Sequence, residues 1–245
     1  MNKFMIHILC CFIPDRKYRH MLRKCRFGRY KITGQNNCIE YYGYKLPKYL
    51  TIIGLNITID GNHNKIIISG NRKPFKNCHF ILSASDNKYI LGKINFLHNV
   101  TIHSTWGNGQ CFYFGDNSDC NGMTVHLNET DACVKIGANT IMSTNIDIWP
   151  TDTHSLIDIS TNRLINKYKS PIEIGDNCWI GQGVKFMKGS VIASHTVVGA
   201  RAIVTRQFTE HNIIIAGNPA HIIKTHVRWN PENPYYMDVQ MNQNK

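Results

Sequence analysis

An apolar residue recurs at every sixth position between Ile174 and Val204, and this repeat restricts the fold more than any other feature. The repeating positions are Ile174, Ile180, Phe186, Ile192, Val198 and Val204. A period of six matches neither the 3.6-residue repeat of a helix nor the simple alternation of a flat strand. It is typical of a solenoid whose flat faces take six residues each, so that one large side chain per face points inward. The repeat therefore predicts a β-helix.

Small residues follow most of the repeating positions, as expected where the backbone turns a corner. They are Gly175, Gly181, Ala193 and Gly199. The same period appears upstream at Ile136, Met142 and Ile148, and its next step predicts an inward position at His154. Residues 155–171 are polar and irregular. Because loops extruded from a rigid stack commonly carry function, we expect a functional site where this insertion leaves the stack.

The segment from residue 51 to 135 contains short β-rich runs separated by Asn and Gly. Both residue types tolerate left-handed backbone angles, so we expect the same solenoid in a looser register. Residues 213–220 predict a last strand and turn, and residues 221–229 predict a short helix over the end of the stack. The tail from Asn230 is expected to be poorly ordered or docked on a neighbour.

We therefore predict a single-domain, all-β solenoid with short helical segments at both ends. Its segments are a basic N-terminal capping segment (1–50), irregular coils (51–135), a strictly repeating part with an insertion at 155–171 (136–220), and a C-terminal helix and tail (221–245).

The N-terminal segment combines an apolar run, residues 4–13, with eight Lys or Arg residues between Arg16 and Lys31. Ten residues are too few to span a hydrocarbon core of about 30 Å, and no small-residue cleavage site follows. Two interpretations remain open. The segment either forms a helix that caps the open end of the solenoid, or lies on an anionic membrane surface.

The net charge of +12 favours an anionic partner, such as a nucleotide-bearing cofactor, an acidic glycan, a membrane surface or nucleic acid. The basic excess lies near the N-terminus and lacks a groove-reading motif, which argues against nucleic acid. The nine cysteines contain no C-x-x-C pair. This odd count predicts reduced thiols in a cytoplasmic protein, at the inner face of the membrane if the basic segment binds there.

From residue 136 to 224 the chain resembles the left-handed β-helix acyltransferases, and within them the bacterial capsular-polysaccharide O-acetyltransferases that include enzymes acting on sialic-acid capsules. The resemblance rests on TDTHSL (151–156), IGDNCWIGQGVKFMKGSVI (174–192), VVGARAIVT (197–205) and IIAGNPAHIIK (214–224). It implies a left-handed parallel β-helix that forms a homotrimer, with acetyl-CoA in the groove between neighbouring prisms.

The resemblance also implies roles for individual residues. The family's catalytic histidine falls on His154 and its tryptophan on Trp179. Asp152 is expected to orient the imidazole, because alternation along a strand puts both side chains on one face. The expected cofactor contacts are Trp179, Lys185, Lys188, Ser194, Ala200, Arg201, Thr205 and Lys224.

The chemistry fits these roles. A sugar hydroxyl is a poor nucleophile, and a neutral imidazole with a pKa near ~6.5 suits its deprotonation during attack on a thioester. No serine elbow or Cys–His pairing is present, which favours direct transfer over a covalent acyl-enzyme. The alternative interpretations are a structural histidine at the loop junction, a tryptophan buried between subunits, and lysines and arginines that are only solvated surface charges.

Two other functions, a zinc enzyme and a non-catalytic glycan-binding solenoid, fit the sequence less well. A zinc enzyme on this fold needs three convergent histidines, whereas the pairs His98/His103 and His221/His226 lack a third candidate beside the strict repeats, so no metal is expected. A glycan-binding solenoid would not need His154. The sequence therefore predicts an acetyl-CoA-dependent O-acetyltransferase that acts on an anionic capsular polysaccharide. A nucleotide-sugar or lipopolysaccharide precursor is the alternative acceptor.

Overall fold

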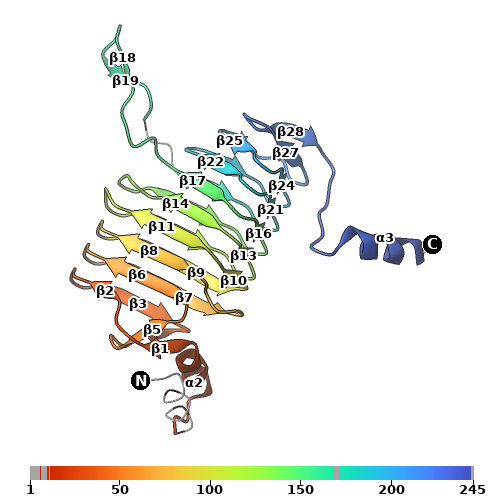
Figure 1. Ribbon diagram of the computed structural model, residues 1–245. Helices are drawn as coiled ribbons and strands as arrows, with labels where there is room; N and C mark the ends of the chain where they lie inside the picture. Colours follow the sequence, from red (N-terminus) through yellow and green to blue (C-terminus); the bar gives the residue numbers. More distant parts are fainter. Residues whose placement is uncertain (1–5, 7–9, 11, 168–170, 244–245) are drawn as a thin grey trace.

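A computed structural model describes residues 6, 10, 12–167 and 171–243. It shows a three-sided stack of coils whose strands pair in parallel with the strands of neighbouring coils (Figure 1). The predicted left-handed β-helix is confirmed.

The three faces of this prism are called sheets I, II and III. Sheet I contains, in spatial order, β2 (Lys31–Ile32), β6 (Leu55–Ile59), β8 (Cys78–Leu82), β11 (Val100–Ser104), β14 (Met123–His126), β17 (Ile146–Trp149), β22 (Lys185–Met187) and β25 (Ile203–Val204). Sheet II contains β26 (Gln207–Phe208), β23 (Val191–Ile192), β20 (Ile172–Ile174), β15 (Cys133–Ile136), β12 (Cys111–Phe114), β9 (Lys88–Ile94), β7 (Lys65–Asn71), β3 (Cys38–Tyr41) and β4 (Tyr44–Lys45). Sheet III contains β10 (Phe96–Leu97), β13 (Asp119–Cys120), β16 (Ile141–Met142), β21 (Trp179–Ile180), β24 (Val197–Val198), β27 (Ile214–Ala216) and β28 (His221–Lys224).

The core consists of inward side chains that stack directly on one another between coils. On sheet I, Ile148 pairs with Phe186, which pairs with Val204, and all three are fully buried. Equivalent rows run through sheets II and III, so the period-six positions face inward as predicted. The hydrogen bonds between coils span 18 residues in this strict part, as between Asp176 and Ser194.

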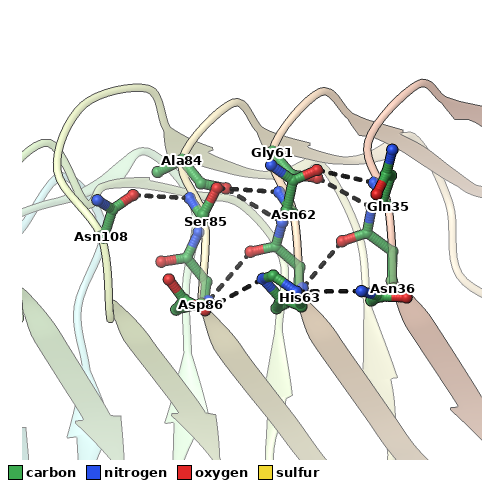
Figure 2. Close-up of polar contacts among 12 residues, drawn as sticks. Gln35, Asn36, Gly61, Asn62, His63, Ala84, Ser85, Asp86 and Asn108 are labelled. Atoms are coloured by element: carbon green, nitrogen blue, oxygen red, sulfur yellow. Dashed lines mark hydrogen bonds and ion pairs between the residues drawn. The ribbon is translucent and has the colours of Figure 1, made fainter.

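The upstream coils are longer, and polar side chains connect their corners. At the corner between sheets I and II, Asn62 Oδ1 accepts the N–H of Gln35 at 2.8 Å, and Ser85 Oγ accepts the N–H of Asn62 at 2.9 Å (Figure 2). Asn108 Oδ1 continues the row to the N–H of Ser85 at 3.0 Å. In this row of corners, Asn36, His63 and Asp86 have left-handed φ angles. Corner amides that leave the sheets are thus satisfied by side chains of the next coil.

Helix α2 (Arg16–Arg23) covers the N-terminal end of the stack. Asp15 caps it by accepting the N–H groups of Lys17 and Tyr18, at 2.8 and 3.1 Å. Met21 and Leu22 are buried in the core cluster. The antiparallel pair β1 (Cys25–Phe27) and β5 (Leu50–Ile52) lies between α2 and the first coils.

Most of the apolar run at 4–13 lies outside the described residues. Among the helices that are described, none is long and apolar enough to cross a membrane.

The C-terminal prediction needs correction. Residues 221–224 form strand β28, not the start of a helix, and pair antiparallel with β27. This strand covers backbone groups that the last coil would otherwise leave open at the sheet edge. The tail, expected to lack order or to dock on a neighbour, contains helix α3 (Pro234–Gln243), which Figure 1 shows standing away from the stack.

The prediction of an inward His154 is wrong. After Trp149 the chain leaves the prism, forms a hairpin of β18 (Ile157–Asp158) and β19 (Arg163–Leu164), and returns at β20. There Ile174 pairs with Ile136 and takes the next inward position, whereas His154 is exposed. The six-residue repeat stops at Ile148 and resumes at Ile174, after the insertion. The reason is that only a residue paired with the previous coil can point into the core.

The prediction of reduced thiols is wrong for one pair. Cys111 and Cys133 form a disulfide between β12 and β15. The two residues are 22 positions apart and become direct neighbours only through the register of successive coils. A search for closely spaced cysteines therefore could not identify them.

We predict that Phe186→Ala lowers the free energy of unfolding by about 3–5 kcal/mol, because it leaves a cavity within the stacked row. Urea unfolding followed by circular dichroism measures the change. Tyr113→Ala, which truncates a ring on the outer side of sheet II, is the matched control and should have a much smaller effect. Equal losses for the two variants would contradict the inward stacking.

Candidate functional site

A charged network anchors the two ends of the insertion to the prism. Asp152 forms an ion pair with Lys188, and Asn166 Nδ2 donates to Asp152 Oδ2 at 2.8 Å. Lys188 also donates to the carbonyl oxygen of Asn166 at 3.2 Å. Burial raises the pKa of Asp152, but the Lys188 ammonium and the Asn166 amide outweigh burial, so the pKa is below its ordinary value. Asp152 is therefore a carboxylate that holds the two ends of the insertion on β22 and its following turn.

His154 lies beside this network. Asn166 Nδ2 donates to the backbone oxygen of His154 at 2.8 Å, which fixes the main chain there. The imidazole is exposed and has no hydrogen-bond partner among the described residues. Asp152 therefore positions the loop that carries His154, while the carboxylate itself contacts Lys188 and Asn166 instead of the ring. An exposed imidazole on an anchored main chain is chemically suited to accept a proton from a bound hydroxyl.

An aromatic stack lies on the outer face of sheet I just before the insertion. The rings of His126 and Trp149 are stacked with centroids 3.6 Å apart, and His103 stacks on the other side of His126 at 5.7 Å. Burial lowers the pKa of His126, the neighbouring His103 lowers it further, and Asp147 acts in the opposite direction. Trp149 is the last residue of β17, and the insertion begins directly after it. The aromatic stack therefore packs beside the start of the insertion.

Trp179 lies on a different side of the prism. It is 48% exposed on β21 of sheet III, and its ring lies 6.4 Å from the ring of Trp229. Trp229 is held by a hydrogen bond from its Nε1 to the carbonyl oxygen of Asn177 at 2.5 Å. The insertion leaves at the edge between sheets I and II, opposite sheet III. The structure therefore does not bring His154 and Trp179 together within one chain.

The expected cofactor contacts are likewise distributed around the last coils. Lys185 pairs with Asp147 at 3.3 Å, and Lys188 pairs with Asp152, so both have carboxylate partners. The other expected contacts lie at several corners or on the last strand, and they are Ser194, Ala200, Arg201, Thr205 and Lys224. Four of these are exposed, and Ser194 is partly buried. No one corner of a single chain unites them.

A cavity of about 520 Å³ opens at the C-terminal end. Its lining includes His211, His226 and Arg228. His211, at the last corner between sheets II and III, has its Nδ1 3.1 Å from the carbonyl oxygen of Ser194, which joins this cavity to the corner one coil earlier. The carboxylate of Glu210 also lines the cavity, so Arg228 and the two imidazoles do not make it uniformly basic. In the described part of the chain, no three His, Cys, Asp or Glu side chains gather into a metal-binding group.

No sequence motif or repeat pointed to His126, Asn166 or Trp229 as part of these surroundings. His126 becomes a neighbour of Trp149 only through the pairing of β14 with β17, one coil apart. The coil between them is longer than a coil of the strict repeat, so counting back from Trp149 would not have found it. Asn166 and Trp229 belong to segments outside the repeat, and no period relates them to the site.

We predict that His126 makes the protein less stable in mild acid. Its folded-state pKa is lowered, so below about pH 6.5 the unfolded chain binds the proton first, and the free energy of unfolding falls as the pH falls. His126→Gln should therefore reduce the slope of stability against pH between about 6.5 and 5, as measured by urea unfolding. His79→Gln, on the same sheet outside the stack, is the control. An unchanged slope in His126→Gln would contradict the role of the stack.

Comparison with known proteins agrees with the fold. Residues 171–206 match the family model for the bacterial transferase hexapeptide, six repeats. The chain covers 88% of its own length and 99% of the solved polysialic acid O-acetyltransferase OatWY, with a TM-score of 0.51 at 22% identity. A likeness at this identity shows the shared fold.

Two curated relatives from Escherichia coli extend the comparison. The protein of strain K12 named "Putative lipopolysaccharide biosynthesis O-acetyl transferase WbbJ" is 32% identical over 146 residues, which are 54% of this chain and 72% of the relative. The polysialic acid O-acetyltransferase of O1:K1 is 33% identical over 101 residues, 41% of this chain and 32% of the relative. The chain spans 58–63% of the length of the curated relatives that it matches most strongly. The repeat, the fold and these relatives together show that the chain belongs to the hexapeptide-repeat acetyltransferases.

Proposed function

We propose that this protein transfers an acetyl group from acetyl-CoA to a hydroxyl of an anionic bacterial surface polysaccharide. The observation that carries this proposal is the exposed, unpaired imidazole of His154 on a main chain anchored by Asn166. Family membership supports the acetyl chemistry. The net charge of +12 and the likeness to enzymes named for polysialic acid support an anionic polymer.

In the proposed reaction, His154 accepts the proton of the sugar hydroxyl as its oxygen attacks the thioester carbonyl. The tetrahedral intermediate collapses to the acetyl ester, and the sulfur of CoA leaves with a proton that His154 returns. Lys188 and Asp152 keep the loop in place and do not exchange protons with the acceptor. The exposed face of Trp179 forms a wall for the acetyl and pantetheine part of the donor.

The placement of the two residues supports a homotrimer with shared sites. His154 lies at the edge between sheets I and II, and Trp179 lies on sheet III opposite that edge. Two prisms that pack side by side can bring the edge of one copy against the face of the next. Each site then uses His154 from one copy and Trp179 from its neighbour, with acetyl-CoA in the groove between them. The candidate cofactor contacts of the last coils, which are scattered in one chain, would likewise come together in the groove between two copies.

We predict that His154→Ala lowers kcat for acetyl transfer by about 10²–10⁴, because the general base is lost. Binding of acetyl-CoA, measured by calorimetry, should remain unchanged. CoA release and ester formation on polysialic acid measure the reaction, and His63→Ala, at an exposed corner of an upstream coil, is the matched control. A His154→Ala variant with full activity would exclude the proposed base.

We further predict complementation between two inactive variants. When His154→Ala and Trp179→Ala subunits are co-expressed with different tags and purified as mixed oligomers, activity should partly return. Some interfaces would then contain His154 from one copy and Trp179 from the other. Absence of recovery in mixed oligomers that are shown to contain both subunits would contradict a shared site.

A lipopolysaccharide precursor is a second candidate acceptor, because the K12 relative with 72% of its length covered carries lipopolysaccharide biosynthesis in its name. Both candidates use the same donor chemistry, and they differ in the size and charge of the acceptor. Transfer to polysialic acid and to purified precursor sugars, with NMR location of the acetyl group, separates them.

A further inference from the structure

A groove of about 420 Å³ lies at the N-terminal end of the prism, far from the last coils. It is formed where the chain crosses from β1 to β2, and it is bordered by β5 and β6. Its lining includes Arg26, Arg29, Lys31, Thr51, Asn56 and Thr58. Its volume is within the range of small-molecule pockets, about 300–1,000 Å³.

Positive charge dominates this groove. Arg26, Arg29 and Lys31 are exposed, and none of them forms an ion pair with a described residue. No acidic side chain is among the described residues that line it. Elsewhere on the prism, Lys65, Lys135 and Lys185 lie against carboxylates. The groove is therefore a place where cations converge without internal compensation.

The floor of the groove contains a buried hydroxyl without a partner. Thr51 is 6% exposed, and its Oγ1 makes no hydrogen bond in the described part of the protein. Gly28 lies over it, and a Cβ added to Gly28 would be 3.1 Å from Thr51 Oγ1. Thr51 Oγ1 has almost no exposed surface, so it lies beneath the groove, and the absence of a side chain at Gly28 lets the crossing segment pack closely over it. A buried polar group in a native protein ordinarily has a partner, so an internal water is expected here.

The walls are held by hydrogen bonds of the main chain. The N–H of Gly28 donates to the carbonyl oxygen of Tyr49 at 3.0 Å. The N–H of Ile52 donates to the hydroxyl oxygen of Tyr30 at 2.7 Å. The crossing segment is therefore positioned before any ligand arrives, which lowers the entropic cost of binding.

We propose that this groove binds a carboxylate-bearing sugar unit of the acceptor polysaccharide. Arg29 and Lys31 would pair with the carboxylate, because guanidinium and ammonium groups form charge-assisted hydrogen bonds with it. The exposed Asn56 amide would bind sugar hydroxyls. A membrane surface is a poorer match, since a flat layer of headgroups does not enter a concave groove.

The position of the groove makes it an anchor for a polymer. It lies at the β2 end of sheet I, and the insertion leaves after β17 of the same sheet. Five strand steps separate β2 from β17, which corresponds to roughly 24 Å at ~4.8 Å per step. A chain bound in the groove can follow the outer face of sheet I to His154, whereas a single sugar cannot reach both places. This inference rests on the proposed function for the identity of the acceptor.

The test measures binding directly, without acetyl transfer. Long polysialic acid and polygalacturonic acid are titrated into the full-length protein, with neutral dextran as the uncharged polymer. The double variant Arg29→Gln/Lys31→Gln should raise the Kd for both acidic polymers at least tenfold, and Asn56→Ala should raise it several-fold. The double variant Lys45→Gln/Lys48→Gln removes two exposed cations outside the groove and should leave the Kd nearly unchanged. Circular dichroism confirms that each variant is folded.

Kinetics separate this inference from the proposed function. If transfer occurs, the groove variants should raise KM for the polymer while kcat and KM for acetyl-CoA stay constant. Groove-dependent polymer binding without any acetyl transfer would support the groove and overturn the enzymatic proposal. Equal polymer binding by the groove variants and the unchanged protein would overturn the groove. The inference would also be overturned if the groove variants lost binding to phosphatidylserine vesicles but kept binding to the polymer, because the groove would then bind a membrane.

Discussion

The structure depends on the pairing of each strand with the strand one coil away. The backbone hydrogen bonds of the parallel strands cross from coil to coil, so partners are distant in the sequence. Asp176 and Ser194 are 18 positions apart, and Ala138 and Asp176, on either side of the insertion, are 38 positions apart. Inward side chains must then match in size along each row, as Ile148, Phe186 and Val204 do on sheet I. This constraint produces the period of six, and it also explains why both ends of the stack carry covers. Helix α2 closes one end and β28 closes the other, since an open coil would expose unpaired backbone groups.

The same constraint decides where irregular segments can occur. A corner is the one place where residues can be added without shifting an inward row, and the long insertion lies at such a corner between β17 and β20. The Asp152–Lys188 pair and Asn166 then fasten the two ends of the insertion to the prism. His154 gains a rigid main chain and an exposed ring from this arrangement. A functional group can therefore be added to the stack without disturbing its core.

Electrostatics divide the outer surface into parts with different chemistry. Near the insertion, the lysines of β22 and the following turn are compensated by Asp147 and Asp152. At the N-terminal end, the cations around Gly28 have no such partners among the described residues. In the proposed function, the uncompensated end holds the anionic polymer, and the region around Asp147 and Asp152 carries His154 as the base. Sheet I connects the two places over roughly five strand spacings.

The amino-acid sequence by itself determined the solenoid, the inward positions from Ile136 to Ile148 and from Ile174 to Val204, and the candidate residues His154 and Trp179, because these follow from local spacing and short motifs. Tertiary structure alone decided the rest. The insertion suspended the register, so Ile174 took the inward position that local counting assigned to His154. The Cys111–Cys133 disulfide, the His126–Trp149 stack and the groove at Gly28 each join residues from different coils or from the cap. Their proximity depends on coil lengths, which are set by corners whose sequences follow no fixed period.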